Sequence, residues 1–179
     1  SNKVAVANKE SIICGWNLIN RSLIKNKTNF IPLDSEHFSL WRLIGNKKLD
    51  DIKEVFLTAS GGPFLNKKKS DLKVVSPKLA LKHPNWKMGK KISVDSATMI
   101  NKIYEVIEAK NIFDIPYKNI EIVIHPRSYV HALIKLNNGL IKLIAHETTM
   151  KIPIFNTLYS CHDKKIQSKP INIKYLNNL

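Results

Sequence analysis

The sequence has few acidic residues, only two cysteines and no long apolar run. Among its 179 residues, 14 Asp and Glu stand against 29 Lys and Arg, which gives a formal net charge of +15 at pH 7. Such an excess of positive charge points to an anionic partner, either a nucleic acid, a membrane surface or a phosphorylated metabolite. Composition alone does not choose among these three.

The other shortages exclude whole classes of protein. No apolar run approaches the roughly 18 residues of a membrane-spanning helix, and residues 1–15 lack the pattern of a signal peptide. Cys14 and Cys161 form no Cys-X-X-Cys pair, which argues against a disulfide framework and for a reducing compartment. Spacing typical of a zinc site is also absent from the histidines at positions 125, 131, 146 and 162.

What is present is globular composition, with 44% hydrophobic residues. Periodicity predicts strands at residues 3–7, 29–33, 54–59, 120–124, 130–136 and 140–145, with a hairpin turn at Asn137-Asn138-Gly139. It predicts helices at residues 9–22, 37–44 and 77–81, and a long helix from Ser96 to about Lys110. After Pro153 the chain turns polar and aperiodic. We expect an α/β fold with a mixed sheet of about four or five strands and helices mainly on one face.

The first candidate site is Asp34-Ser35-Glu36, which follows a predicted strand. In an extended segment, residues two apart point the same way, so both carboxylates can face one Mg²⁺ or Mn²⁺. The alternative is an ordinary capping segment before the next helix, and the three residues alone favour it.

The second candidate is the helix expected to begin at Ser96. Asn101, Lys102 and Glu105 lie within about one turn of each other, so that the first two can hold a phosphate and Glu105 can complete a metal site. A phosphate at Ser96 would also gain from the positive end of the helix dipole. The alternative is a solvated face with a Lys–Glu pair.

Two loops are further candidates. Ser60-Gly61-Gly62-Pro63 follows a strand and lets backbone N–H groups approach an anion, although a simple tight turn explains it as well. Residues 83–89 (HPNWKMG) place a Trp in a loop bounded by Pro and Gly, which is typical of a mobile lid over a ligand.

Several blocks occur together and in order. They are NKES at residues 8–11, DSEH at 34–37, SGGPF at 60–64, KHPNWKMG at 82–89, KISVDSATMINK at 91–102, then Glu105, His125-Pro126 and His131. Over roughly residues 4–154 this order resembles the 1-deoxy-D-xylulose-5-phosphate reductoisomerase family. The resemblance implies residues 1–10 as the end of an NADPH-binding domain, 11–160 as the catalytic domain, and 161–179 as a linker toward a C-terminal helical domain. The dinucleotide-binding glycine motif does not occur in the chain, so the chain by itself is expected to be inactive.

The resemblance also implies roles for residues. Asp34, Glu36 and Glu105 match the ligands of Mg²⁺ or Mn²⁺. Lys9, Glu36 and Glu105 match catalytic positions, and Asn8, Glu10 and Gly89 match the NADPH side. The implied contacts to the sugar phosphate are Lys9, Ser35, Glu36, Ser60, His83, Trp86, Ser96, Asn101, Lys102 and Glu105. His131 matches a histidine near the site without a defined role.

The implied activity is isomerisation and NADPH-dependent reduction of 1-deoxy-D-xylulose 5-phosphate to 2-C-methyl-D-erythritol 4-phosphate, in isoprenoid synthesis. We expect a homodimer of the bacterial cytoplasm or the plastid stroma, without nucleic-acid or membrane partners. The alternatives are a relative acting on another sugar phosphate or a basic nucleic-acid-binding module. Departures from the family pattern are Ile103, Tyr104, Arg127 and Thr148-Thr149.

Overall fold

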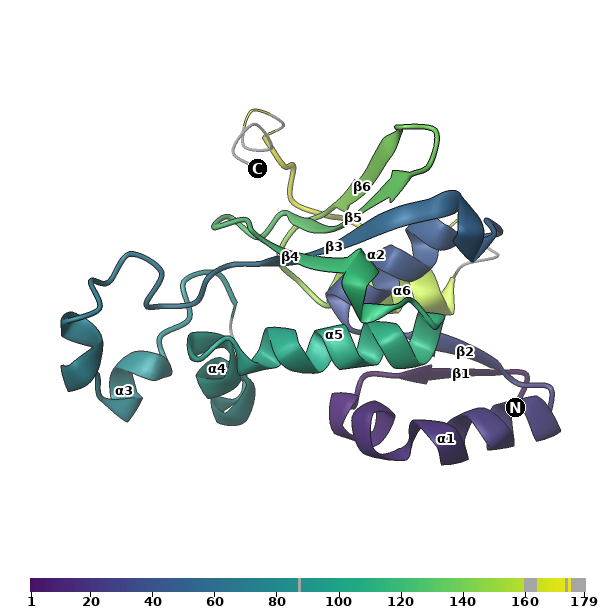
Figure 1. Ribbon diagram of the computed structural model, residues 1–179, viewed down its shortest axis with the longest axis horizontal. Helices are drawn as coiled ribbons and strands as arrows, with labels where there is room; N and C mark the ends of the chain where they lie inside the picture. The colour runs from purple at the N-terminus through teal and green to yellow at the C-terminus, as the bar shows by residue number, and fades with distance from the viewer. Residues whose placement is uncertain (87, 160–163, 173, 175–179) are drawn as a thin grey trace.

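The computed structural model describes residues 1–86, 88–159, 164–172 and 174. A four-stranded mixed sheet with the order β4-β3-β5-β6 forms its centre, and β1 and β2 make a separate parallel pair (Figure 1). The strands are β1 (Lys3–Val6), β2 (Asn29–Pro32), β3 (Ile52–Ala59), β4 (Ile120–Ile124), β5 (Val130–Leu136) and β6 (Ile141–Ala145). The expected α/β class, mixed sheet and hairpin are confirmed.

Six α-helices lie within the described residues. They are α1 (Lys9–Lys25), α2 (Ser35–Ile44), α3 (Pro77–Ala80), α4 (Lys90–Ala97), α5 (Ile100–Phe113) and α6 (Lys151–Leu158). Short 3₁₀ turns occur at Leu49–Asp51, Asp71–Val74 and Tyr117–Asn119. Within the part of the chain that the structure describes, every helix is too short or too polar to cross a membrane.

The core lies between one face of the sheet and helices α2 and α5. β3 and β5 run antiparallel and β3 and β4 run parallel, and alternate residues of β3 and β5 point into this core. The buried cluster consists of Leu40, Leu43, Ile44, Ile52, Val55, Leu57, Ala109, Ile115, Ala132, Ile134 and Leu136. Helix α1 lies below α5 beside β1 and β2 (Figure 1). This packing brings the starts of α1, α2 and α5 together.

The long helix expected from Ser96 is wrong, because the chain breaks between α4 and α5. Met99 has a left-handed backbone with φ 61°. The Thr98 hydroxyl bonds the carbonyls of Val94 and Asp95, which ends α4. Ser96 therefore lies in the last turn of α4 and not at a helix start.

Two further expectations need correction. Asp34-Ser35-Glu36 is not extended, because Asp34 caps α2 and its carboxylate accepts a bond from the Glu36 amide at 3.3 Å. The chain after Pro153 is not aperiodic either, since α6 continues to Leu158. The Thr149 hydroxyl, two residues before the helix starts, accepts from the Lys151 amide at 3.3 Å. Of the expected linker and lid, residues 160–163, 173, 175–179 and 87 lie outside the described residues.

Candidate active site

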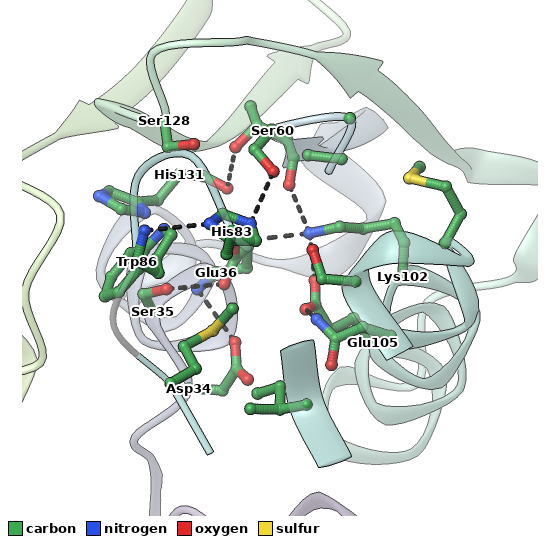
Figure 2. A pocket seen from close by; sticks show the side chains of 18 of the residues that line it. Asp34, Ser35, Glu36, Ser60, His83, Trp86, Lys102, Glu105, Ser128 and His131 are labelled. Atoms are coloured by element: carbon green, nitrogen blue, oxygen red, sulfur yellow. Dashed lines mark hydrogen bonds and ion pairs between the residues drawn. The ribbon is translucent and has the colours of Figure 1, made fainter. Parts of the chain in front are cut away.

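A pocket of about 180 Å³ opens where α2 and α5 begin and β3 ends (Figure 2). Most of the residues singled out from the sequence line this one pocket. They are Asp34, Ser35, Glu36, Ser60, His83, Trp86, Ser96, Asn101, Lys102, Glu105 and His131. Residues that are up to 97 positions apart in the sequence therefore converge on one cavity.

The three carboxylates predicted as metal ligands lie together on one side of the pocket. Asp34 and Glu36 come from the first turn of α2, and Glu105 comes from the second turn of α5. One oxygen of each carboxylate lies within 4.8 Å of the others. Carboxylate oxygens are the ligands that Mg²⁺ and Mn²⁺ prefer, so this donor set fits a hard divalent cation.

The electrostatics of this cluster also fit a cation. Burial, followed by the charge of Glu105, raises the pKa of Glu36 to about 8. Burial also disfavours ionised Asp34, but the Lys9 ammonium, His37 and Glu36 together outweigh it and hold the pKa of Asp34 well below its usual range. The carboxylates thus crowd one another, and a bound dication would offset both the burial and the repulsion that raise the pKa of Glu36.

Two lysines partly neutralise the cluster. Lys9 Nζ lies 3.2 Å from Asp34 and 3.6 Å from Glu105, and it donates to the Asn101 side-chain oxygen at 2.8 Å. Lys102 Nζ donates to a Glu105 oxygen and to the Thr58 carbonyl. Both ammonium groups keep a raised pKa, because these carboxylates outweigh the effect of burial. Lys9 is buried behind the described pocket lining, with its ammonium group against the carboxylates.

The pocket also carries polar groups suited to a phosphate, some of them directly beside the carboxylate cluster. Ser60, Ser96, Asn101 and Lys102 all line it, but the helix-dipole argument for Ser96 is wrong because Ser96 lies at the C-terminal end of α4. Gly62 lets the turn after β3 approach α4 closely. Its φ is 68°, and a Cβ there would lie 2.8 Å from the Ser96 carbonyl oxygen. Only glycine lets the turn after β3 lie this close to α4.

Trp86 lines the pocket on the side across from Lys102 and Glu105 (Figure 2). Trp86 packs edge-on against His131, with ring centroids 6.2 Å apart, and His131 stacks on His146 at 3.7 Å. Burial and the neighbouring His146 lower the pKa of His131 to about 3, so this ring is a neutral platform. The sequence left the role of His131 undefined, and the structure places it in the pocket lining against Trp86.

The three residues expected on the NADPH side lie elsewhere, at the exposed starts of α1 and α4. Asn8 is the N-cap of α1 and Gly89 is the N-cap of α4. Glu10 pairs with Lys91 at 2.7 Å, which ties these two helix starts together. They gather on one surface, separate from the described lining of the pocket.

Some site residues were missed. His37 and Glu108 are buried beside Asp34, and one ligand atom from each of the three lies within 4.8 Å of the others. Glu108 lies one turn after Glu105 on α5, so helical spacing was a usable signal. Ser128, Met99 and Met150 also line the pocket, and nothing in the local sequence marks them.

Two of the residues that depart from the family pattern lie on α5. Ile103 is 51% exposed, and the Lys91 ammonium lies over the Tyr104 ring, 5.0 Å from its centroid.

Known proteins similar to this chain belong to one enzyme family. The family model described as the 1-deoxy-D-xylulose 5-phosphate reductoisomerase C-terminal domain matches residues 30–113. A 1-deoxy-D-xylulose 5-phosphate reductoisomerase from Pelagibacter ubique is 60% identical over 98% of this chain and 45% of its own length. The enzyme from Aquifex aeolicus is 43% identical over 96% of this chain and 44% of its own length.

Solved structures similar to this chain are reductoisomerases as well. The 1-deoxy-D-xylulose 5-phosphate reductoisomerase from Zymomonas mobilis in complex with NADPH aligns with a TM-score of 0.87 and 33% identity, over 98% of this chain and 45% of that one. The chain belongs to the 1-deoxy-D-xylulose 5-phosphate reductoisomerase family. A reductoisomerase bound to NADPH, fosmidomycin and magnesium aligns with a TM-score of 0.86 and 36% identity, over 96% of this chain and 45% of that one. The chain spans about 45% of the length of these reductoisomerases.

Proposed function

We propose that a protein carrying this chain isomerises 1-deoxy-D-xylulose 5-phosphate and reduces the product with NADPH to 2-C-methyl-D-erythritol 4-phosphate. The observation that carries the proposal is the pairing, in one pocket, of a three-carboxylate cluster with a polar wall suited to a phosphate. Membership of the reductoisomerase family and structures of relatives with NADPH, magnesium and fosmidomycin support it.

In this proposal Asp34, Glu36 and Glu105 hold Mg²⁺ or Mn²⁺. The cation, when bound, supplies Lewis-acid polarisation of the substrate oxygens. Ser35 donates to Glu36 at 2.7 Å and so fixes one ligand oxygen. Lys9 lies against the same carboxylates and presents its ammonium group where charge develops on a reacting oxygen.

The phosphate is proposed to bind at the other end of the pocket. Ser60, His83, Ser96 and Asn101 offer hydroxyl, imidazole and amide groups there, and Lys102 adds a charge between phosphate and cation. Trp86 covers the bound sugar. Binding energy from the phosphate end would then serve to hold the sugar carbons at the cation, which raises the rate of the chemical step.

NADPH, when bound, supplies the hydride for the reduction. The surface at Asn8, Glu10 and Gly89 is the proposed cofactor side of this chain, and residues 1–10, 11–160 and 161–179 remain the proposed division into domains. The deciding experiment measures NADPH oxidation by the full-length protein with 1-deoxy-D-xylulose 5-phosphate and Mg²⁺. Turnover that EDTA abolishes and Mn²⁺ restores is the expected result, whereas no turnover under any of these conditions contradicts the proposal.

A homodimer formed through the outer sheet face is also proposed. Register places Phe56, Leu133 and Leu143 side by side on the face away from the helices, and Leu143 and Ile141 are 41% and 60% exposed. An apolar strip of this kind is typical of an interface. Sedimentation of the full-length protein should give a dimer, and Leu143→Glu should give a monomer. The proposed compartment, by family resemblance, is the bacterial cytoplasm or the plastid stroma.

A further inference from the structure

Asn85 connects the Trp86 loop to the neighbouring turn at residues 126–128. Its side-chain Nδ2 donates to the Pro126 carbonyl at 2.6 Å and to the Ser128 hydroxyl oxygen at 2.9 Å. A carbonyl oxygen only accepts, so the amide nitrogen must face Pro126 and the orientation of the side chain is fixed. Both hydrogens of the amide are used in these two bonds.

His83 fixes the shape of the same loop. Its Nδ1 accepts from the backbone N–H groups of Asn85 at 3.2 Å and of Trp86 at 3.0 Å. The proton is therefore on Nε2, which donates to the Ser60 hydroxyl at 3.0 Å. Ser60 and His83 thus shape the loop from within, while Asn85 attaches it to the Pro126–Ser128 turn.

Ser128 is an unusual partner for this bond. It is buried, lines the pocket, and has a left-handed backbone with φ 55°. Glycine would adopt this conformation with less strain, but it would lack the hydroxyl that Asn85 contacts. Strained residues of this kind persist where the surroundings hold them, often at functional sites.

We propose that Asn85 is a positioning residue, which docks the Trp86 loop onto the Pro126–Ser128 turn so that Trp86 covers the bound ligand. Asn85 acts through Trp86, since it lies outside the described pocket lining while Trp86 lines it. The proposal rests on the function proposed above and adds the contact that holds the loop in its covering position.

The test uses the full-length protein labelled with 5-fluorotryptophan, with the Trp86 resonance assigned by its loss in Trp86→Phe. Fosmidomycin is titrated with Mg²⁺ present. Asn85→Ala should bind fosmidomycin about 10-fold more weakly, the loss expected for two neutral hydrogen bonds, and should shift the Trp86 resonance without ligand. Ser128→Ala should cost about 3-fold, because the bond to Pro126 remains.

Asn85→Asp tests the same contact by repulsion. It keeps the shape of Asn85 but turns a carboxylate toward the Pro126 carbonyl, so it should bind no better than Asn85→Ala. Asn46→Ala, at an exposed turn after α2, is the matched control and should behave as wild type. Thermal unfolding and Mn²⁺ affinity should stay near wild type in all four variants.

Asn85→Ala that binds fosmidomycin within about 2-fold of wild type and leaves the Trp86 resonance in place would overturn the docking role. Failure of the wild-type protein to bind fosmidomycin with Mg²⁺ would instead count against the proposed function. In that case the ligand-free spectra still decide the docking role, since they compare the same resonance in wild type and Asn85→Ala.

Discussion

The two sides of the pocket are built from different interactions. The pocket floor, made of Lys9, Asp34, Glu36, Lys102 and Glu105, is a buried ionic cluster held by three helices. The pocket rim consists of the turn at 60–62, the segment 83–86 and the turn at 126–128, joined by neutral hydrogen bonds. Charge is expensive to bury unless it is paired, and in the floor Lys9 and Lys102 pair with the carboxylates.

This contrast separates two tasks. Changes in the floor should act on cation affinity and chemistry, because its atoms carry the charge. Changes in the rim should act on ligand retention and leave the cation largely unaffected, because neutral bonds between loops can break at modest cost. Variants in the floor and in the rim test whether cation binding and ligand retention are separate in this way.

The largest effect is expected for Asp34→Asn and Glu105→Gln. Each removes a negative charge from the cluster, and even partners one step removed from a metal ligand change affinity by about 10- to 100-fold. We therefore expect Mn²⁺ affinity to fall about 100-fold or more, with turnover lost. Calorimetric Mn²⁺ titration measures this, with Glu121→Gln at an exposed strand position as control. Unchanged titration in both variants would remove the floor as the cation site.

The sequence was enough to predict this floor. The family resemblance that the ordered blocks carry implied Asp34, Glu36 and Glu105 as partners, although the local reason given for Asp34 and Glu36 was wrong. They share a face because they lie in the first turn of a capped helix, not because the segment is extended. The capping alternative is confirmed, since the Asp34 carboxylate accepts from the Glu36 amide, and the same carboxylate also faces the other two. Metal binding by the three carboxylates stays a prediction.

The rim was less predictable, because tertiary contacts determine it. The segment around Met99 contains no Gly or Pro, yet the helix breaks there where the Gly62 turn packs on the end of α4. Asn85 and Ser128 are 43 positions apart, and no local pattern pairs them. His37 was missed for another reason: it looks like an ordinary helical residue until the fold buries it beside Asp34. Glu108 could have been found from its spacing to Glu105 on α5.

Lys102 lies where the floor meets the phosphate end, so Lys102→Met should sharpen the division. Loss of a charge-assisted bond should weaken fosmidomycin by about 1.5–3 kcal/mol, or roughly 10- to 150-fold. Mn²⁺ affinity should rise or stay the same, because the ammonium group competes with the cation for Glu105. Lys110→Met, on the exposed side of α5, is the control. Weakened Mn²⁺ binding in Lys102→Met would show that floor and phosphate end are not separable.

Gly62→Ala tests the rim through packing. The added Cβ would lie 2.8 Å from the Ser96 carbonyl oxygen, in a backbone with φ 68°. Gly139→Ala is a matched control, because its φ is 87° and nothing described lies within 4 Å of the added carbon. Both variants carry the backbone strain, so the difference isolates the contact with α4 and should be about 1–3 kcal/mol in free energy of unfolding. Equal losses in denaturant titrations would mean that the turn does not press on α4.

The smallest effect is expected for Glu108→Gln in the protein without added metal. Burial raises the pKa of Glu108 from 4.5 to about 7, so the folded state keeps a proton that the unfolded state loses. The folded state binds more protons in this window, so its stability should fall as pH rises from about 4.5 to 7. Glutamine does not titrate, and the variant should gain on wild type across that range. Lys9 and His37 lie within 4 Å of the carboxylate and offset part of the charge, so we expect a gain of about 1 kcal/mol.

Glu54→Gln is a control of opposite sign, because the hydrogen bond from Lys135 lowers the pKa of Glu54 and stabilises the fold only at higher pH. Thermal unfolding between pH 5 and pH 8 measures both, and parallel curves for Glu108→Gln and wild type would show that Glu108 stays ionised in the folded protein.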